Sequence, residues 1–377
     1  MRVALLVVAT LIAGCGRIGF DEQVAPSPDG RLIDHIDQLV AYANQTCVIV
    51  NDAALCWGAN DAGQLGDEST VDRTVPTPVH LPAGIVTRIS QGESHACAIV
   101  EGVLYCWGAT FDVKPAAFPL ANAIGPVAEV GCGRGLSCAI VDARAQCWGI
   151  NSAGQLGDGT QTDRATPAPI ADAIELATLS VGDDHACAQG PAIGPVCWGH
   201  NDDGALGFGA AVPDISSTPT FVVADVTAMP QIAGWHACGL ATGNLLCWGR
   251  NTEGELGDGT LTSSALAVQV KGLANVEAFA VGGGPTDFDA SCAIVGGLVS
   301  CWGAGTQGRL GNGDVQSSPV PVPVTGLPAA ARAVAIGYDH ACALLVTNEI
   351  YCWGAGTRGQ LGDGKQQSSL TPVRVAL

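Results

Sequence analysis

Cysteines have the most regular spacing in this chain, and their thiols can form disulfides, bind metal ions or act as nucleophiles. The tripeptide Cys-Trp-Gly occurs seven times, with a period near 50 residues, and a second cysteine precedes each copy by nine or ten residues. The predicted pairs are Cys47 with Cys56, Cys97 with Cys106, Cys138 with Cys147, Cys187 with Cys197, Cys238 with Cys247, Cys292 with Cys301, and Cys342 with Cys352. Such a repeated pair predicts one repeated structural or chemical unit.

The nine-residue spacing favours a disulfide across a β-hairpin. A two-residue turn at Glu101-Gly102 would place Cys97 opposite Cys106 in a non-hydrogen-bonded pair. The Cα atoms of such a pair are about 4.5 Å apart, at the short end of the disulfide range. The two ten-residue spacings require a three-residue loop or a bulge. Zinc is an alternative, although structural zinc sites usually show closer cysteine pairs, and buried free thiols are a third interpretation.

Histidines and aspartates also recur at fixed positions. Four histidines stand two residues before a paired cysteine: His95, His185, His236 and His340. Packed sheets lie about 10 Å apart, so one histidine per unit cannot converge on a metal ion, and we expect a repeated structural hydrogen bond. Calcium needs six to eight oxygens at one centre, whereas each repeated aspartate stands in its own glycine-rich turn. We therefore expect turn capping at Asp67, Asp158, Asp258 and Asp363.

Composition narrows the classes of function. The 377 residues carry a formal net charge of −19, which argues against nucleic-acid binding because phosphates attract basic surfaces. A hydrophobic share of 47% excludes a disordered chain. No nucleophile–base arrangement and no phosphate-binding glycine loop is legible. The sequence therefore predicts no catalytic residues, no metal, no cofactor and no enzyme.

The elements that position these residues are short strands. Each unit has an apolar stretch, the cysteine hairpin, a turn-rich block such as residues 151–160, and a further strand such as Thr77-Pro78-Val79. The chain contains 51 glycines and 21 prolines, and this composition is typical of strands joined by tight turns. Seven units of four strands predict an all-β, seven-bladed β-propeller over residues 38–377, with the repeated tryptophans packed between blades.

The N-terminus resembles the signal of a bacterial lipoprotein. An apolar run from Val3 to Ala13 is too short to span a bilayer, which takes about 20 helical residues. It ends in Leu-Ile-Ala-Gly-Cys, and the resemblance implies cleavage after residue 14 and lipidation of Cys15. Residues 15–37 are expected to form a flexible tether. An ordinary signal peptide is the alternative.

The pattern G-x-x-H-x-C-A, then C-W-G-x-N-x-x-G-Q-L-G-D-G-T, then P-V resembles the regulator of chromosome condensation repeat family, whose fold is a seven-bladed propeller. Full turn blocks stand at 151–160 and 251–260, whereas residues 109–114 depart from the pattern and residues 282–289 are longer. The chain ends in Thr371-Pro372-Val373, without a hairpin after it. We expect this last strand to complete the first blade and so close the ring.

The variable positions of the G-x-x-H loops are candidate contacts. Equivalent loops share one propeller face, and aromatic residues are enriched in interface cores. The candidate binding face comprises Trp235, Tyr338, Phe288 and Arg134. Cys132 is left over once Cys15 and the fourteen paired cysteines are assigned, and it is a buried, reactive or intermolecular thiol.

The expected function is an exported, lipid-anchored, non-catalytic protein-interaction module. It would be a monomer that faces the periplasm or the cell surface, contacts the membrane through its anchor only and binds a protein or glycan, not nucleic acid. The resemblance implies an alternative, a guanine-nucleotide exchange factor for a small GTPase. A further alternative is an extracellular inhibitor or adhesin.

Overall fold

The computed structural model describes residues 33, 35–109, 125–172, 174–209, 213–223, 226–227, 229–284 and 288–377, and the backbone of 114–119. The predicted signal peptide, Cys15 and most of the predicted tether lie outside these residues. Two 3-10 turns, η1 (Asp202–Gly204) and η2 (Thr306–Gly308), are the helical elements of the described part. No helix there is long and apolar enough to cross a membrane.

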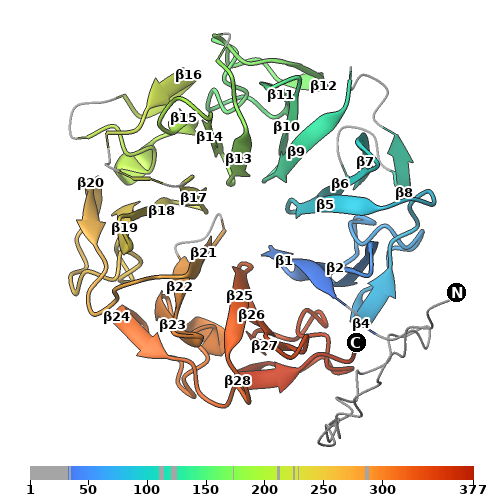
Figure 1. Cartoon of the computed structure of the whole chain (residues 1–377), viewed down its shortest axis with the longest axis vertical. Coiled ribbons are helices and arrows are strands. Elements are labelled where there is room, and N and C mark those ends of the chain that lie inside the picture. Colours follow the sequence, from blue (N-terminus) through green and yellow to red (C-terminus); the bar gives the residue numbers. More distant parts are fainter. Residues whose placement is uncertain are drawn as a thin grey trace, which may run out of the picture.

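The strands form seven four-stranded sheets arranged in a ring (Figure 1), which confirms the predicted seven-bladed propeller. The blades are, in chain order, β1 (Ile36–Tyr42), β2 (Gln45–Val50), β3 (Ala53–Gly58), β4 (Arg73–Pro78); β5 (Val86–Gln91), β6 (His95–Val100), β7 (Val103–Gly108), β8 (Lys114–Pro119); β9 (Val127–Cys132), β10 (Leu136–Val141), β11 (Arg144–Gly149), β12 (Arg164–Pro169); β13 (Thr178–Val181), β14 (His185–Gln189), β15 (Val196–His200), β16 (Ile215–Phe221); β17 (Gln231–Ile232), β18 (His236–Ala241), β19 (Asn244–Gly249), β20 (Ser264–Gln269); β21 (Ala278–Gly282), β22 (Ala290–Val295), β23 (Leu298–Gly303), β24 (Ser318–Pro323); and β25 (Ala331–Ile336), β26 (His340–Leu345), β27 (Ile350–Gly354), β28 (Ser369–Arg374).

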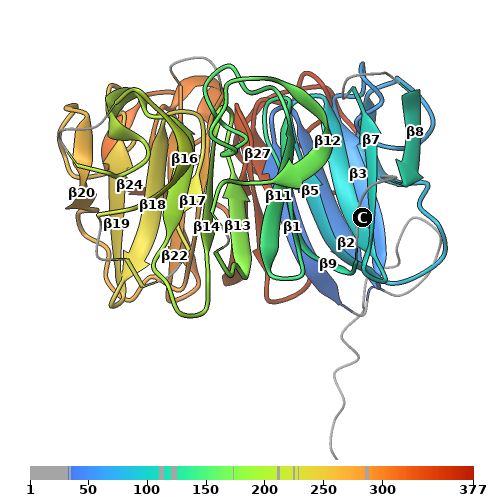
Figure 2. The same ribbon diagram turned by 90° about the horizontal axis from the view of Figure 1, so that it is seen from above.

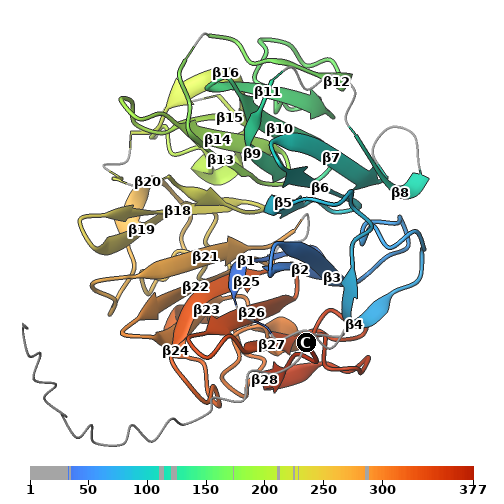
Figure 3. The same ribbon diagram turned by 45° about the vertical axis from the view of Figure 1, so that its right-hand side comes forward.

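Each blade is a contiguous stretch of sequence, and this corrects the expected ring closure. The last strand, β28, pairs with β27 of its own blade, with Cys352 opposite Val373, and does not join β1. The proline-valine strand is the outer strand of the repeat that precedes it, because the turn block folds the chain back onto the Cys-Trp-Gly strand. Blades 7 and 1 instead lie side by side (Figure 3), and their side chains pack together.

The up-and-down order of the strands gives the ring two different faces (Figure 2). We call the upper face the one that carries the loops between the first and second strands and the turn blocks between the third and fourth strands. The lower face carries the hairpin turns between the second and third strands and the links between blades. Ile36, the first residue of β1, therefore lies at the lower face, and Tyr42 lies at the upper face.

All seven predicted cysteine pairs are disulfide-bonded in the structure, with Cα–Cα distances of 4.0 to 4.1 Å. Each disulfide joins opposite positions of the second and third strands of one blade, as the pairing of β6 with β7 shows. In chain order the bonds join Cys47 to Cys56, Cys97 to Cys106, Cys138 to Cys147, Cys187 to Cys197, Cys238 to Cys247, Cys292 to Cys301, and Cys342 to Cys352. The hairpin prediction is therefore confirmed for every repeat, and the zinc and free-thiol interpretations of these fourteen cysteines are not needed.

The two ten-residue spacings are accommodated differently. Around Thr347 a three-residue loop closes the hairpin, as expected, since Leu345 N donates to Glu349 O at 2.9 Å. Around Ala192 the strands separate earlier, and the connection between β14 and β15 is longer. In both cases the extra residue lies in the turn, so the cysteines remain opposite each other.

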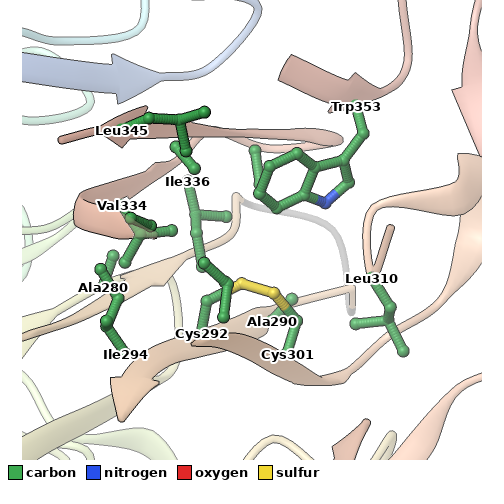
Figure 4. Close-up of a cluster of buried hydrophobic side chains, with 14 residues drawn as sticks. Ala280, Ala290, Cys292, Ile294, Cys301, Leu310, Val334, Ile336, Leu345 and Trp353 are labelled. Carbon is green, nitrogen blue, oxygen red and sulfur yellow. A yellow bond between two sulfur atoms is a disulfide. The ribbon is translucent and has the colours of Figure 1, made fainter. Parts of the chain in front are cut away.

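Hydrophobic side chains fill the space between neighbouring blades. Between blades 6 and 7, the Cys292–Cys301 disulfide packs with Val334, Ile336 and Trp353 (Figure 4). Six of the seven repeated tryptophans are 0% exposed, and Trp148 is 3% exposed. These positions confirm that the tryptophans pack from blade to blade.

The turn block of one blade holds the tryptophan of the next. Trp198 Nε1 donates to Gln155 O at 2.9 Å, and five other tryptophans make the same bond to the preceding block. Trp148 has no such bond among the described residues, because the preceding repeat lacks the block. Gly157 must be glycine: its φ is +65°, and a Cβ there would lie 2.8 Å from the Trp198 ring.

The turn blocks also close the ring. Gly364 N, in the last block, donates to Thr74 O of β4 at 2.9 Å, and Arg358 of the same block is hydrogen-bonded to Asp72. The outer strands are sheet edges, and prolines such as Pro319, Pro321 and Pro323 remove the N–H groups that a foreign strand would use. Ring closure therefore relies on loop and side-chain contacts between blades 7 and 1.

Candidate functional site at the upper face

The G-x-x-H loops form a tight ring around the central channel at the upper face. The first glycine of a loop lies against the carbonyl of the next loop, so that a Cβ on Gly92 would be 2.3 Å from Gly133 O. A Cβ on Gly337 would likewise be 2.6 Å from Ala43 O, and Tyr338 N donates to that carbonyl at 2.8 Å. Glycine at this position lets successive loops pack closely around the channel at the upper face.

The repeated histidines bind hydroxyl groups of the following blade. The Nε2 atom of His95 lies 2.8 Å from Ser137 Oγ, that of His236 lies 2.8 Å from Ser291 Oγ, and that of His340 lies 2.7 Å from Thr46 Oγ1. Each hydroxyl stands immediately before a disulfide cysteine. Burial lowers the pKa of His95 to about 4 and that of His340 to about 3, so both rings are neutral at pH 7. The predicted structural hydrogen bond is confirmed at these three interfaces.

His185 is the exception. Its side chain is 1% exposed, and its Nε2 atom has no hydrogen-bond partner among the described residues. The residue that corresponds to Ser137 and Ser291 in the following blade is Ala237, which faces Trp248 across the hairpin as Ser137 faces Trp148. The hydrogen bond is absent here because the following blade supplies no hydroxyl.

The repeated aspartates cap turns, as predicted. Asp158 Oδ1 accepts a hydrogen bond from Thr160 N at 2.9 Å, and Asp258 Oδ1 accepts one from Thr260 N at 2.8 Å. Asp67 and Asp363 make the equivalent bonds. In the described part of the chain, the residues grouped closely enough to hold a metal ion are His35, Asp37 and Asp52, all exposed and none at these turns.

Two tyrosines and a buried carboxylate meet at the channel mouth, which we define as Tyr42, Asp183 and Tyr338. The Tyr42 hydroxyl donates to Asp183 Oδ1, although the two residues come from blades 1 and 4. The rings of Tyr42 and Tyr338 have centroids 5.6 Å apart and are tilted by 52°. Side chains from three blades therefore meet over the channel.

Asp183 has an unusual charge environment. Its side chain is 2% exposed, and its Oδ2 atom lacks a hydrogen-bond partner among the described residues. Burial raises the pKa of Asp183 to about 7, the hydrogen bond from Tyr42 opposes this, and the charges of Asp289 and Asp184 raise the pKa further. Arg134 lowers the pKa of Asp183 by its positive charge. The carboxyl group is thus poised to gain or lose a proton near neutral pH.

The four residues predicted to form a binding face all lie on upper-face loops, but they are not one cluster. Phe288 is 40% exposed. Arg134 Nε is 3.4 Å from Glu93 Oε2 in an exposed ion pair. The Trp235 ring packs edge-on against the His200 ring, with ring centroids 5.4 Å apart. Tyr338 is the one member of this set at the channel mouth. Arg309, which is 1% exposed, holds the Phe288 and Tyr338 carbonyls and the Asp339 carboxylate, and so fixes two of these loops.

The sequence pattern did not point to Tyr42, and it gave no reason to select Asp183. The first repeat has Tyr42-Ala43-Asn44-Gln45 where residues 92–95, 182–185 and 337–340 have G-x-x-H, so the pattern does not mark its loop. Aligning Gln45 with the repeated histidines would have placed Tyr42 at the glycine position. Asp183 stands at a variable position of its own loop, and only the closed ring reveals that Tyr42 reaches it.

The channel below the mouth is a cavity of about 430 Å³ lined by the inner strands β1, β5, β9, β13 and β17. Its glutamine and serine side chains tie these strands together: Gln38 is hydrogen-bonded to both backbone groups of Ile89, and Gln231 Nε2 donates to Phe279 O. Cys132, the free cysteine of the described residues, borders this cavity. Burial raises the pKa of the Cys132 thiol to about 12, so it is an inert thiol at neutral pH.

Comparisons with known proteins agree with this architecture. The profile of the regulator of chromosome condensation (RCC1) repeat matches residues 51–99, 296–344 and 348–377, and a second RCC1 repeat profile matches residues 331–360. The ultraviolet-B receptor UVR8 of Arabidopsis thaliana is 35% identical over 88 residues, which span 22% of this chain and 20% of the receptor. Human E3 ubiquitin-protein ligase HERC2 is 34% identical over 87 residues, 23% of this chain and 2% of the ligase.

Solved structures share the fold along most of the chain. Human WBSCR16 superposes with a TM-score of 0.75 at 22% identity, covering 86% of this chain and 93% of that one. Prp20p of Saccharomyces cerevisiae, whose crystal structure is reported together with its binding to Gsp1p and histones, superposes with a TM-score of 0.73 at 17% identity. The superposition covers 90% of this chain and 87% of Prp20p. RCC1 repeat profiles therefore match parts of this seven-bladed propeller, and at these identities the likeness to solved structures concerns the fold alone.

Proposed function

We propose that this chain is an exported, lipid-anchored propeller without catalytic activity that binds a protein partner through its upper face. The observation that carries the proposal is the gathering of variable aromatic and charged side chains on upper-face loops that a repeated glycine packs into a rigid ring. Rigid scaffolds that present variable loops commonly serve as binding surfaces. Yeast RCC1 (Prp20), a propeller of similar fold, has a reported structure in which Kap60 is bound to it. The fold is therefore compatible with protein partners.

Two further features support export and orientation. Seven disulfides persist in oxidising compartments and are rare in reducing ones. The first strand begins at Ile36 on the lower face, so a tether from a lipidated Cys15 would enter there. An anchor attached at the lower face would leave the upper face unobstructed for a partner.

A site-specific cross-linking experiment tests the proposed face. A photoreactive amino acid at Phe288, which is 40% exposed on the upper face, is expected to capture one partner in intact cells. The matched control is the same substitution at Leu298, which is 75% exposed and lies after a hairpin turn of the lower face. Equal capture at both positions, or capture from Leu298 alone, would refute an upper-face interface.

The anchor is tested separately by the intact mass of protein from the membrane fraction. The expected species begins at Cys15 and carries an acyl adduct. A chain that retains residues 1–14, or one without the adduct, would refute lipidation while leaving the binding face untouched.

A further inference from the structure

We propose that the channel mouth formed by Tyr42, Asp183 and Tyr338 is a binding site for an organic cation, the ammonium or guanidinium group of a basic side chain on the partner. The inference rests on the proposed function and specifies the chemistry that the upper face recognises. It follows from two independent features, a pair of aromatic rings and a buried carboxylate oxygen without a partner.

The two tyrosine rings supply a surface that attracts cations. Their centroids are 5.6 Å apart and their planes are inclined at 52°, so the two rings form a tilted pair and do not stack flat. The faces of aromatic rings carry negative potential, and cations bind within about 6 Å of a ring centroid. Burial raises the pKa of both Tyr42 and Tyr338, so the rings are neutral phenols and attract cations through this potential.

The buried carboxylate supplies the opposite charge. Asp183 Oδ1 accepts the hydrogen bond from the Tyr42 hydroxyl, which fixes the carboxyl group at the mouth, while Oδ2 has no partner in the described part of the chain. An unpartnered oxygen in a side chain 2% exposed is costly, since buried polar groups are nearly always hydrogen-bonded. An N–H donor from a ligand cation would satisfy it.

A second buried carboxylate oxygen without a partner lies on the loop between β21 and β22 of blade 6. Asp289 is 0% exposed, its Oδ2 accepts from Trp235 N at 2.9 Å and lies 3.2 Å from His236 Nδ1, and its Oδ1 has no partner among the described residues. Its charge acts on Asp183, so the two carboxylates contribute to one negative field. The repulsion between them would be relieved by a bound positive charge.

The remaining charged groups around Asp183 leave this field negative. Asp184 adds to it from the same loop, and the charge of Glu93, on the loop after β5, acts on both Tyr42 and Tyr338. Arg134 is a positive group that acts on Asp183, and it already forms an exposed ion pair with Glu93. A second cation, Arg309, acts on Asp289 and is paired with Asp339. A ligand cation therefore meets more acidic than basic groups at the mouth.

An organic cation fits these groups better than a metal ion does. The close triad of metal-ligating residues in the described chain is at His35, Asp37 and Asp52, on the lower face, and not at the channel mouth. Aromatic rings beside a single carboxylate suit a large, weakly hydrated cation that can lie on a ring face while one N–H reaches the oxygen. The test therefore uses lysine and arginine side chains.

The experiment titrates short peptides into the isotopically labelled protein and follows amide chemical shifts. The peptides are capped Gly-Gly-Lys-Gly-Gly, its arginine counterpart and its norleucine counterpart, which keeps the aliphatic chain and lacks the charge. We expect saturable binding of the lysine or the arginine peptide, with shifts at the end of β1 and at the loops after β13 and β25, and no binding of the norleucine peptide. Comparing lysine with arginine distinguishes an ammonium site from a guanidinium site.

Two variants test the carboxylate. Asp183→Asn keeps the acceptor for Tyr42 and removes the charge, and we expect it to weaken binding about tenfold or more, as loss of a buried charge partner does. Asp142→Asn is the matched control, because it makes the same charge change at an exposed hairpin turn of the lower face and should leave affinity within about twofold. If Asp183→Asn does not fold, Tyr338→Leu removes one ring and should also weaken binding.

A proton should compete with the cation. Because the pKa of Asp183 is about 7, lowering the pH from 8 to 6 protonates the carboxyl group and should weaken peptide binding in the parent protein but not in Asp183→Asn. Equal binding of lysine and norleucine peptides, or equal losses in Asp183→Asn and Asp142→Asn, would overturn the proposal.

Failure of this site and failure of the proposed function are distinguishable. If the peptides do not bind but Phe288 still cross-links a partner in Asp183→Asn, the upper face is an interface without a cation site. If the lysine peptide binds and no partner is captured at the upper face, the cation site stands and the proposed interface fails.

Discussion

Installing a serine at Ala237 should stabilise the propeller by supplying a hydroxyl that one blade interface lacks. At three interfaces a buried histidine Nε2 lies 2.7 to 2.8 Å from a Ser or Thr hydroxyl of the next blade. At the interface between blades 4 and 5, His185 Nε2 is buried without a partner among the described residues, and Ala237 occupies the equivalent position. The substitution Ala237→Ser adds one oxygen at the position where three other blades have Thr46, Ser137 and Ser291.

The magnitude follows from the cost of an unsatisfied buried group. A buried polar atom without a hydrogen bond costs about 1–3 kcal/mol, and burial of the new hydroxyl offsets part of the gain. We therefore expect Ala237→Ser to raise the free energy of unfolding by about 1 kcal/mol. The mirror change, Ser137→Ala, leaves His95 Nε2 unsatisfied and should lower the free energy of unfolding by about 1–3 kcal/mol.

The assay is guanidinium-induced unfolding at pH 7 with disulfides intact, followed by tryptophan fluorescence. Burial lowers the pKa of His185 to about 3, so the ring is neutral throughout the measurement. The denaturant dependence should be unchanged in both variants, so that a shift of the midpoint reports stability. A lower midpoint for Ala237→Ser, or no change for Ser137→Ala, would refute the reasoning that the hydroxyl satisfies the histidine.

Three further predictions concern charge, packing and thiols. The contribution of Asp183 to the free energy of unfolding should fall by on the order of 4 kcal/mol as pH rises from about 4 to about 7, because folded Asp183 keeps a proton that the unfolded carboxyl group releases at its usual pKa of 3.8. The buried histidines act in the opposite direction, because burial lowers their pKa and the unfolded rings bind protons in this range. The Asp183 contribution is therefore measured as the difference between the pH-dependent unfolding curves of the parent protein and of Asp183→Asn. In guanidinium-induced unfolding, Gly157→Ala should destabilise the fold by about 2 kcal/mol more than Gly159→Ala. Both glycines have positive φ, but only a Cβ on residue 157 would contact the Trp198 ring, at 2.8 Å. Equal losses of stability in the two variants would show that φ alone matters. Cys132 should resist alkylation in the native protein, because burial raises the pKa of its thiol to about 12. Fourteen further thiols should react only after reduction and unfolding. Rapid labelling of Cys132 in the native protein would contradict the burial of this thiol.

Local patterns determined the fold class and the disulfides of this protein. The spacing of Cys97 and Cys106 defines a hairpin register, and seven repeats of one supersecondary unit have few ways to bury their apolar faces other than a ring. The same local logic predicted the aspartate turn caps and the histidine hydrogen bonds, because these depend on residues that recur at fixed offsets.

Ring closure and the channel mouth depended on tertiary structure. A terminal strand can pair within its own repeat or across the ring, and the short turn block before β28 favours its own blade, which the sequence pattern alone did not reveal. The contact between Tyr42 and Asp183 joins residues 141 positions apart, from opposite sides of the ring. Such contacts depend on how many blades close the circle and on how their loops tilt inward, so no local spacing encodes them. The unsatisfied His185 likewise becomes evident only when Ala237 is seen to be its neighbour.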